Sequence, residues 1–121
     1  GDVSEHGFNH GKGFAVLPTE DVLKDESYLN DIAPEKEVTT DLREATFMSQ
    51  ESTDDHLMHL IGTSEDREGN PYYIIKNSWN HNSNDFQGKL HMSLPFVKAK
   101  TIAIMVHKDA VPKKLRKKLD F

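Results

Sequence analysis

The stretch YYIIKNSWN (residues 72–80) joins a run of aromatic and β-branched residues to a polar end that holds the only tryptophan, Trp79. Such a run is typical of a buried strand. A second strand-like run, STDDHLMHLIG (residues 52–62), begins with charge and carries His56. A histidine at the start of one strand and an asparagine, Asn77, at the end of the next indicate a polar site at the rim of a sheet.

The wider pattern predicts an α+β domain with consecutive antiparallel strands rather than βαβ units. We expect four strands, at residues 55–63, 71–77, 87–93 and 100–107. We expect helical structure in four places: a turn or two in the acidic stretch 19–37, a capped helix in 37–50, a short turn in 93–99 and a basic helix in 109–119. Residues 1–13 are glycine-rich and predict a loop.

The register of the first hairpin decides whether the two polar residues meet. In one register Gly62 faces Pro71, and His56 then lies opposite Asn77 with Cβ atoms about 4.5–5.5 Å apart. A tighter turn centred on Gly69 and the residue after it would shift the register and separate the pair. The sequence leaves both open. If the pair meets, the asparagine carbonyl fixes the ring orientation and tautomer of a histidine that acts as a general base.

Length and composition exclude several classes of protein. The 121 residues fit one domain, the formal net charge is −5, and there is no cysteine for a disulfide, a thiolate metal site or a thiol nucleophile. No run approaches the roughly 18 apolar residues of a membrane span, and residues 1–13 lack the apolar core of a signal peptide. Residues 98–121 carry eight Lys or Arg and two Asp or Glu. They lack interleaved aromatics, so we expect an exposed basic helix or tail, 108–121, and no nucleic-acid or membrane partner.

Histidine is frequent enough to raise the question of a metal site. His56 and His59 are three residues apart, which places them on opposite faces of a strand. Two more, His6 and His10, fall in the glycine-rich loop and are expected at the surface. We therefore expect no metal and no cofactor.

Two other catalytic arrangements are also disfavoured. Ser78 follows a strand, but no strand–turn–helix elbow surrounds it, so it does not resemble a serine nucleophile. Asp54 and Asp55 are neighbours on a predicted strand and point apart, which does not suit a carboxylate pair.

The combined motifs resemble a known family. TDDHLMHLIG followed by YYIIKNSWN is similar to the His and Asn blocks of papain-like cysteine peptidases, in particular the bleomycin hydrolase and aminopeptidase C branch of peptidase family C1. Further similar segments are DVSEHGF, TTDLREATF and AKTIAIMVHKDAVPKKL, in that order along the chain. The acidic stretch 19–37 matches least. The resemblance implies the antiparallel, open β-barrel-like half of the papain-like fold, with a few peripheral helices.

The resemblance assigns a role to each motif residue. His56 matches the catalytic histidine, Asn77 the asparagine that orients it, and Trp79 the tryptophan that shields their contact. The nucleophilic cysteine and the oxyanion-hole glutamine belong to the N-terminal half of such enzymes, and neither is in this chain. The family usually has glycine after the tryptophan, whereas this chain has Asn80, which tolerates a left-handed conformation.

Residues 1–121 are accordingly expected to be a single domain, the His- and Asn-bearing C-terminal half of a cysteine aminopeptidase, and to be a fragment, an expressed piece or a product of processing. The expected partners are a peptide substrate and the missing half that bears the cysteine. The resemblance also implies a cytoplasmic hydrolase, without excluding an exported parent, and a homo-oligomer such as a hexamer. If Phe121 is the native C-terminus, the resemblance also implies that the C-terminal tail lies in or near the substrate-binding cleft. The alternative is a non-catalytic binding or assembly module with the same half-fold.

Overall fold

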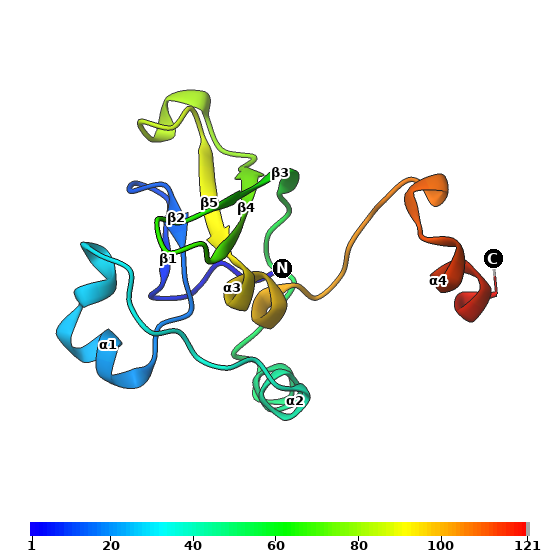
Figure 1. The fold of residues 1–121 in the computed structure, drawn as a ribbon, viewed down its shortest axis with the longest axis horizontal. Coiled ribbons are helices and arrows are strands. Elements are labelled where there is room, and N and C mark those ends of the chain that lie inside the picture. Colours follow the sequence, from blue (N-terminus) through cyan, green and yellow to red (C-terminus); the bar gives the residue numbers. More distant parts are fainter. Residues whose placement is uncertain (121) are drawn as a thin grey trace.

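The computed structural model describes residues 1–120, which form one five-stranded sheet with short helices around it and one C-terminal helix set apart (Figure 1). The strands are β1 (Phe8–Asn9), β2 (Phe14–Ala15), β3 (His59–Glu65), β4 (Pro71–Lys76) and β5 (Lys89–Ser93). The helices are α1 (Glu20–Asp25), α2 (Thr40–Met48), α3 (Leu94–Lys100) and α4 (Lys113–Leu119), with 3-10 turns at Ser27–Leu29, His81–Ser83 and Lys108–Ala110. The α+β class is therefore confirmed.

The strands lie in the order β1-β2-β5-β4-β3, and neighbouring strands are antiparallel except at one place. There β2 and β5 run parallel, with Phe14 beside His91. The expected antiparallel pairing of consecutive strands holds for β3, β4 and β5, whereas β2 and β5 are parallel because a long connection brings the chain back beside β2 in the same direction. Within residues 1–120 the sheet has two free edges, β1 and β3, so the expected barrel-like closure is not confirmed.

The hydrophobic core lies between the sheet and α3. On β5, Leu90 and Met92 are buried while the residue between them faces outward, and Phe96 and Ala99 of α3 complete the cluster. Burying a side chain such as Leu90 stabilises the fold by about 1.5–3 kcal/mol. The helix starts where it does because Ser93 Oγ accepts a hydrogen bond from the Phe96 amide at 3.1 Å. The short helix expected in residues 93–99 is confirmed.

The β3–β4 hairpin has a tighter turn than the register in which Gly62 faces Pro71 would require. Glu65, not Gly62, faces Pro71, and the strand spans His59–Glu65 rather than residues 55–63. The Asp66 carboxylate accepts hydrogen bonds from the Asn70 amide at 2.9 Å and its side-chain nitrogen at 2.8 Å. An aspartate that bonds to the backbone beyond it closes a compact turn, and this turn sets the observed register.

The strand expected over residues 100–107 is wrong. Helix α3 continues to Lys100, and within residues 1–120 the backbone of 102–106 forms no hydrogen bond. Met105 is 92% exposed. This segment leads away from the sheet (Figure 1). Strand propensity produces a strand only where a neighbouring strand supplies hydrogen bonds, and no described strand lies beside this segment.

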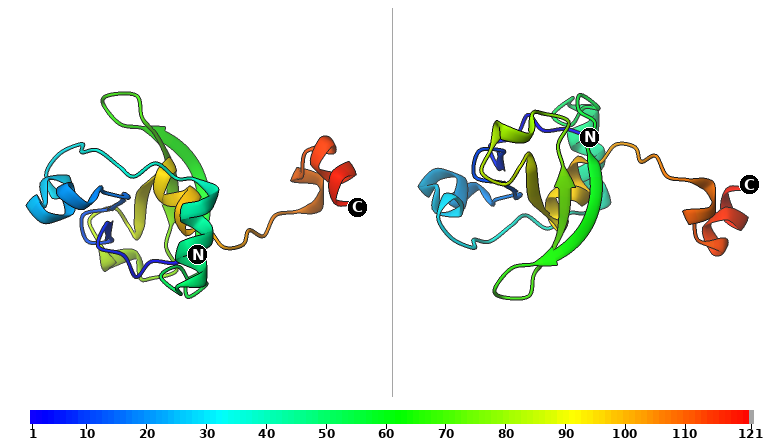
Figure 2. Two further views of the ribbon diagram at one scale, coloured as in Figure 1. Left: turned by 90° about the horizontal axis from the view of Figure 1, so that it is seen from below. Right: turned by 90° about the horizontal axis from the view of Figure 1, so that it is seen from above.

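The two predicted helices at 37–50 and 109–119 are present with narrower bounds. Thr39 caps α2, accepting from the Leu42 amide at 3.1 Å, and the helix spans Thr40–Met48. Helix α4 begins after Pro112 and stands apart from the sheet in every view (Figure 2). Phe121 lies outside the described residues. Among residues 1–120, every helix is too short or too polar to cross a bilayer.

Candidate functional site

His56 lies in an extended segment between α2 and β3, three residues before the strand begins. Its backbone pairs with the start of the chain: the His56 amide donates to the Gly1 carbonyl at 3.0 Å, and the Gly1 nitrogen donates to the His56 carbonyl at 2.9 Å. This reciprocal pair fixes the backbone at His56 from both sides. The register of the hairpin therefore does not determine where this histidine lies.

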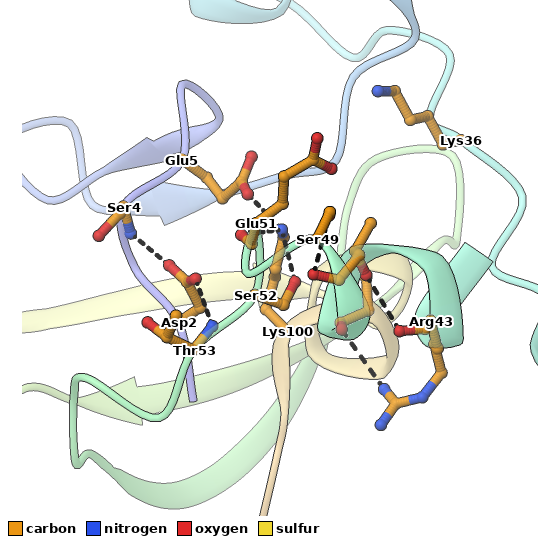
Figure 3. Close-up of polar contacts among 12 residues, drawn as sticks. Asp2, Ser4, Glu5, Lys36, Arg43, Ser49, Glu51, Ser52, Thr53 and Lys100 are labelled. Atoms are coloured by element: carbon orange, nitrogen blue, oxygen red, sulfur yellow. Dashed lines mark hydrogen bonds and ion pairs between the residues drawn. The ribbon is translucent and has the colours of Figure 1, made fainter.

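A cluster of buried polar side chains holds the residues just before His56 (Figure 3). Asp2 accepts hydrogen bonds from the amides of Ser4 and Thr53, both at 2.7 Å. Lys100, buried at the end of α3, donates to Ser52 Oγ at 2.9 Å and forms an ion pair with Glu5. The cluster ties the N-terminal segment and α3 to the stretch that carries the histidine.

Asn77 follows β4 directly, and a backbone hydrogen bond holds it in place. Its amide donates to the Gly88 carbonyl at 2.9 Å, and only 3% of the residue is exposed. Its side-chain oxygen, Oδ1, lies 2.7 Å from His56 Nε2. An amide oxygen can only accept, so Nε2 carries the proton. The second ring nitrogen of His56, Nδ1, forms no hydrogen bond with any of residues 1–120 and is left to face a reacting group.

The two residues thus meet although the predicted register is not the observed one. The tighter turn does shift the ladder, but it does not separate the pair. The reason is that His56 lies outside β3, in a segment positioned by Gly1 and by the buried polar cluster.

Trp79 lies over the histidine. The ring centroids of Trp79 and His56 are 5.3 Å apart with the planes at 49°, and Phe8 packs edge-on against the indole with a centroid distance of 6.0 Å. The indole is 45% exposed. Within this chain the indole therefore packs against the His56 ring and remains partly open to solvent.

A second histidine belongs to the same cluster, and the sequence did not reveal it. His10 follows β1, its Nδ1 lies 3.2 Å from Asn77 Nδ2, and its Nε2 lies 2.7 Å from Ser83 Oγ. Its ring meets Trp79 edge-on at a centroid distance of 4.6 Å. His6 is exposed as expected, whereas His10 is only partly exposed and joins the polar cluster around Asn77.

The electrostatics of His10 differ from those of an isolated histidine. Burial, together with repulsion from His56, lowers the pKa of His10 below its ordinary value of 6.5. The ring is therefore neutral at neutral pH. A neutral ring has one nitrogen that accepts and one that donates, which matches its two different partners.

The turn after the tryptophan also differs from expectation. Asn80 has φ −54° and ψ 143°, so it is not left-handed. Its Oδ1 accepts from the Asn82 amide at 2.8 Å and caps the 3-10 turn His81–Ser83. An asparagine side chain that bonds two residues ahead is a common way to start a turn. The chain thus makes the turn by side-chain capping at this position.

The other candidates do not join the site. His59 is exposed on β3, and residues 1–120 contain no group of three or more His, Cys, Asp or Glu that could hold a metal ion. Within the same residues, the Ser78 side chain forms no hydrogen bond with either histidine of the cluster. The arrangement supplies an oriented base, His56, a fixed acceptor, Asn77, and an aromatic cover. It supplies no nucleophile of its own.

Comparison with known proteins identifies a family. The family model described as the peptidase C1-like family matches residues 23–121, which include His56, Asn77 and Trp79 but not His10. A search of curated proteins finds no match to the chain.

Proposed function

Because the chain belongs to the peptidase C1-like family, we propose that it supplies the catalytic histidine and asparagine of a cysteine peptidase whose nucleophile lies outside these 121 residues. The observation that carries the proposal is the 2.7 Å contact between His56 Nε2 and Asn77 Oδ1, made by a buried amide between residues 21 positions apart. It leaves Nδ1 as the nitrogen that exchanges protons.

The proposed reaction uses this orientation in each step. His56 Nδ1 takes the proton of the cysteine thiol, and the thiolate attacks the carbonyl carbon of the peptide. When the tetrahedral intermediate collapses, the C–N bond breaks and Nδ1–H protonates the leaving amine. In the second half, Nδ1 takes a proton from water, the hydroxide attacks the acyl-enzyme, and the C–S bond breaks to release the acid. Asn77 Oδ1 accepts from Nε2–H throughout, which keeps Nδ1 directed at the reacting atoms.

Within this family we propose the bleomycin hydrolase and aminopeptidase C branch, and with it removal of N-terminal residues from short peptides. The support is the sequence resemblance alone, in the blocks around His56 and Asn77 and in the flanking segments. The same resemblance supports a homo-oligomeric, cytoplasmic enzyme. The basic tail, residues 108–121, is proposed to limit access to the cleft when the remaining half of the enzyme is present.

One observation favours a second candidate function. The chain contains no cysteine, so taken by itself it suits a non-catalytic binding or assembly module that keeps the half-fold of a peptidase. The reading frame upstream of Gly1 distinguishes the two. A Gln-and-Cys motif at a helix start supports the enzyme, and a native start at or near Gly1 supports the module.

The decisive experiment uses the enzyme that contains this chain. We expect His56→Ala to abolish hydrolysis of an aminoacyl reporter substrate, because the base is removed. Asn77→Ala is expected to have a milder effect, because the base remains but is no longer oriented. His59→Ala is the matched control: this histidine is exposed on β3 three residues away and should leave activity unchanged. Full activity in His56→Ala would refute the assignment.

A further inference from the structure

Asn77 has a second polar partner besides the proposed catalytic base. Its side-chain oxygen faces His56, and its side-chain nitrogen, Nδ2, faces Nδ1 of His10 at 3.2 Å. The amide therefore lies between two imidazole rings. Both rings also contact Trp79, at centroid distances of 5.3 Å and 4.6 Å.

The donor and acceptor roles along this row are determined by chemistry. An amide nitrogen can only donate, so His10 Nδ1 must accept and cannot carry a proton. The proton of the neutral His10 ring is then on Nε2, which donates to Ser83 Oγ at 2.7 Å. The row runs in one direction: His56 donates to Asn77, Asn77 donates to His10, and His10 donates to Ser83.

Rotating the Asn77 amide by half a turn would exchange its oxygen and nitrogen. The oxygen would then face the unprotonated Nδ1 of His10, so that two acceptors would meet. The nitrogen would face His56 Nε2, which could accept only after its proton had moved to Nδ1. That is the tautomer in which the free nitrogen of His56 can no longer take a proton. His10 therefore disfavours the rotated amide, and with it the tautomer of His56 that carries its proton on Nδ1.

The backbone of His10 is itself held in place. Asn84 Nδ2 donates to the His10 carbonyl at 2.7 Å and to the Lys89 carbonyl at 2.9 Å, which ties the end of β1 to the start of β5. The titratable side chain that faces His10 is His56; its other contacts, Asn77, Trp79 and Ser83, carry no charge. The ring thus remains a neutral acceptor in a fixed position.

We propose that His10 is a positioning residue that, by accepting a hydrogen bond from Asn77 Nδ2, holds the Asn77 oxygen toward His56. Its effect on the tautomer of His56 is a property of this chain, whereas its effect on catalysis rests on the proposed function. The two effects are tested separately.

The first test uses the 121-residue chain and long-range proton–nitrogen NMR of the histidine rings. In the unaltered chain, His56 and His10 are both expected as the Nε2–H tautomer at pH 7.5. His10→Phe keeps an aromatic ring beside Trp79 but removes the acceptor, and His56 should then show a mixture of tautomers. His10→Asn places an amide oxygen near the position of Nδ1 and should restore the Nε2–H form. An unchanged His56 tautomer in His10→Phe would overturn the proposal.

A failure of His10→Phe to fold does not end this test. His10→Gln places its amide near Nε2 rather than Nδ1, so it keeps a partner for Ser83 but not for Asn77. We expect it to resemble His10→Phe. If His10→Gln restored the tautomer as well as His10→Asn, contact with Asn77 would not be the cause, and the proposal would be wrong.

The second test uses the enzyme that contains the chain. Loss of one hydrogen bond that orients the base predicts a fall in kcat of about tenfold for His10→Phe, with KM unchanged, and near-normal kcat for His10→Asn. A rise in KM alone, or equal losses in both variants, contradicts positioning. If the tautomer changes as expected but His56→Ala leaves activity intact, the proposed function fails and the structural role of His10 stands.

Discussion

Replacing Lys100 with methionine removes the buried cation that anchors the chain before His56. The lysine is 6% exposed, it is paired with Glu5, and it donates to Ser52 Oγ and the Glu51 carbonyl (Figure 3). Methionine retains most of the apolar volume but leaves the Glu5 carboxylate without its partner. The variant therefore tests the ion pair rather than the packing.

The magnitude follows from the burial of the two partners. Removing one partner of a fully buried pair costs about 3–5 kcal/mol, because the other charge is left uncompensated. The Glu5 side chain is 28% exposed, so water screens part of that cost, and we expect a loss of about 2–3 kcal/mol in the free energy of unfolding. Lys36→Met is the matched control: its partner, Glu20, is 72% exposed, and such pairs contribute about 0–1 kcal/mol.

The assay is urea denaturation of the 121-residue chain at pH 7, followed by circular dichroism. The double variant Lys100→Met with Glu5→Gln removes both charges and should recover part of the lost stability. The reasoning is refuted if Lys100→Met costs no more than Lys36→Met, or if the double variant is no more stable than Lys100→Met alone.

Three further predictions use urea denaturation of the same chain, over a series of pH values for Glu35. A Cβ on Gly7 would lie 1.9 Å from a backbone oxygen, so Gly7→Ala should lose about 1–3 kcal/mol or more. Gly11→Ala, whose nearest contact would be 3.7 Å away, should stay within about 0.5 kcal/mol; equal losses would contradict the steric argument. Burial raises the pKa of Glu35 above its ordinary 4.5, so the stability it contributes is complete below pH 4.5 and is lost as the pH rises through the raised pKa. Glu35→Gln should remove this pH dependence of the free energy of unfolding. If the free energies of the variant and of the unaltered chain changed in parallel with pH, the prediction would be wrong. Leu90→Ala should cost about 2–5 kcal/mol because the residue is fully buried, whereas Met105→Ala should change stability little; similar losses would mean that the core is elsewhere.

Local sequence patterns were sufficient to predict much of the fold. The strand over Pro71–Lys76 and the cap of α2 at Thr39 depend on residues a few positions apart. The short helix α3 likewise follows from its own capping serine. Each of these elements is specified within its own segment, so the sequence alone was enough to predict it.

Errors arose where distant segments decide the outcome. Whether residues 100–107 form a strand depends on a neighbouring strand that the sequence does not identify, and residues 1–120 supply none there. The parallel pairing of β2 with β5 depends on how a long connection returns. The hairpin register, which the sequence left open, is set within the turn itself, where the Asp66 side chain accepts a hydrogen bond from the Asn70 amide.

The candidate site likewise has one part that the sequence could predict and one part that it could not. Contact between His56 and Asn77 could be anticipated from the family motif, whereas the strand register that would pair them is not the observed one. His10 lies 67 positions from Asn77, in a glycine-rich loop without periodicity. No spacing rule links the two, and only the β1–β2–β5 pairing brings them together.

The unpaired segment 102–106 also bears on how the chain behaves at high concentration. It is apolar, it carries no charged residue, it lacks proline, and its backbone donors are free within residues 1–120. Those are the conditions under which short segments of different molecules stack into cross-β aggregates. Lys100 is buried and paired with Glu5, but Lys108 is exposed just beyond the segment, where a charge acts as a gatekeeper against such stacking. High salt, which screens the repulsion between the Lys108 side chains of different molecules, should therefore promote aggregation of the folded chain without unfolding it.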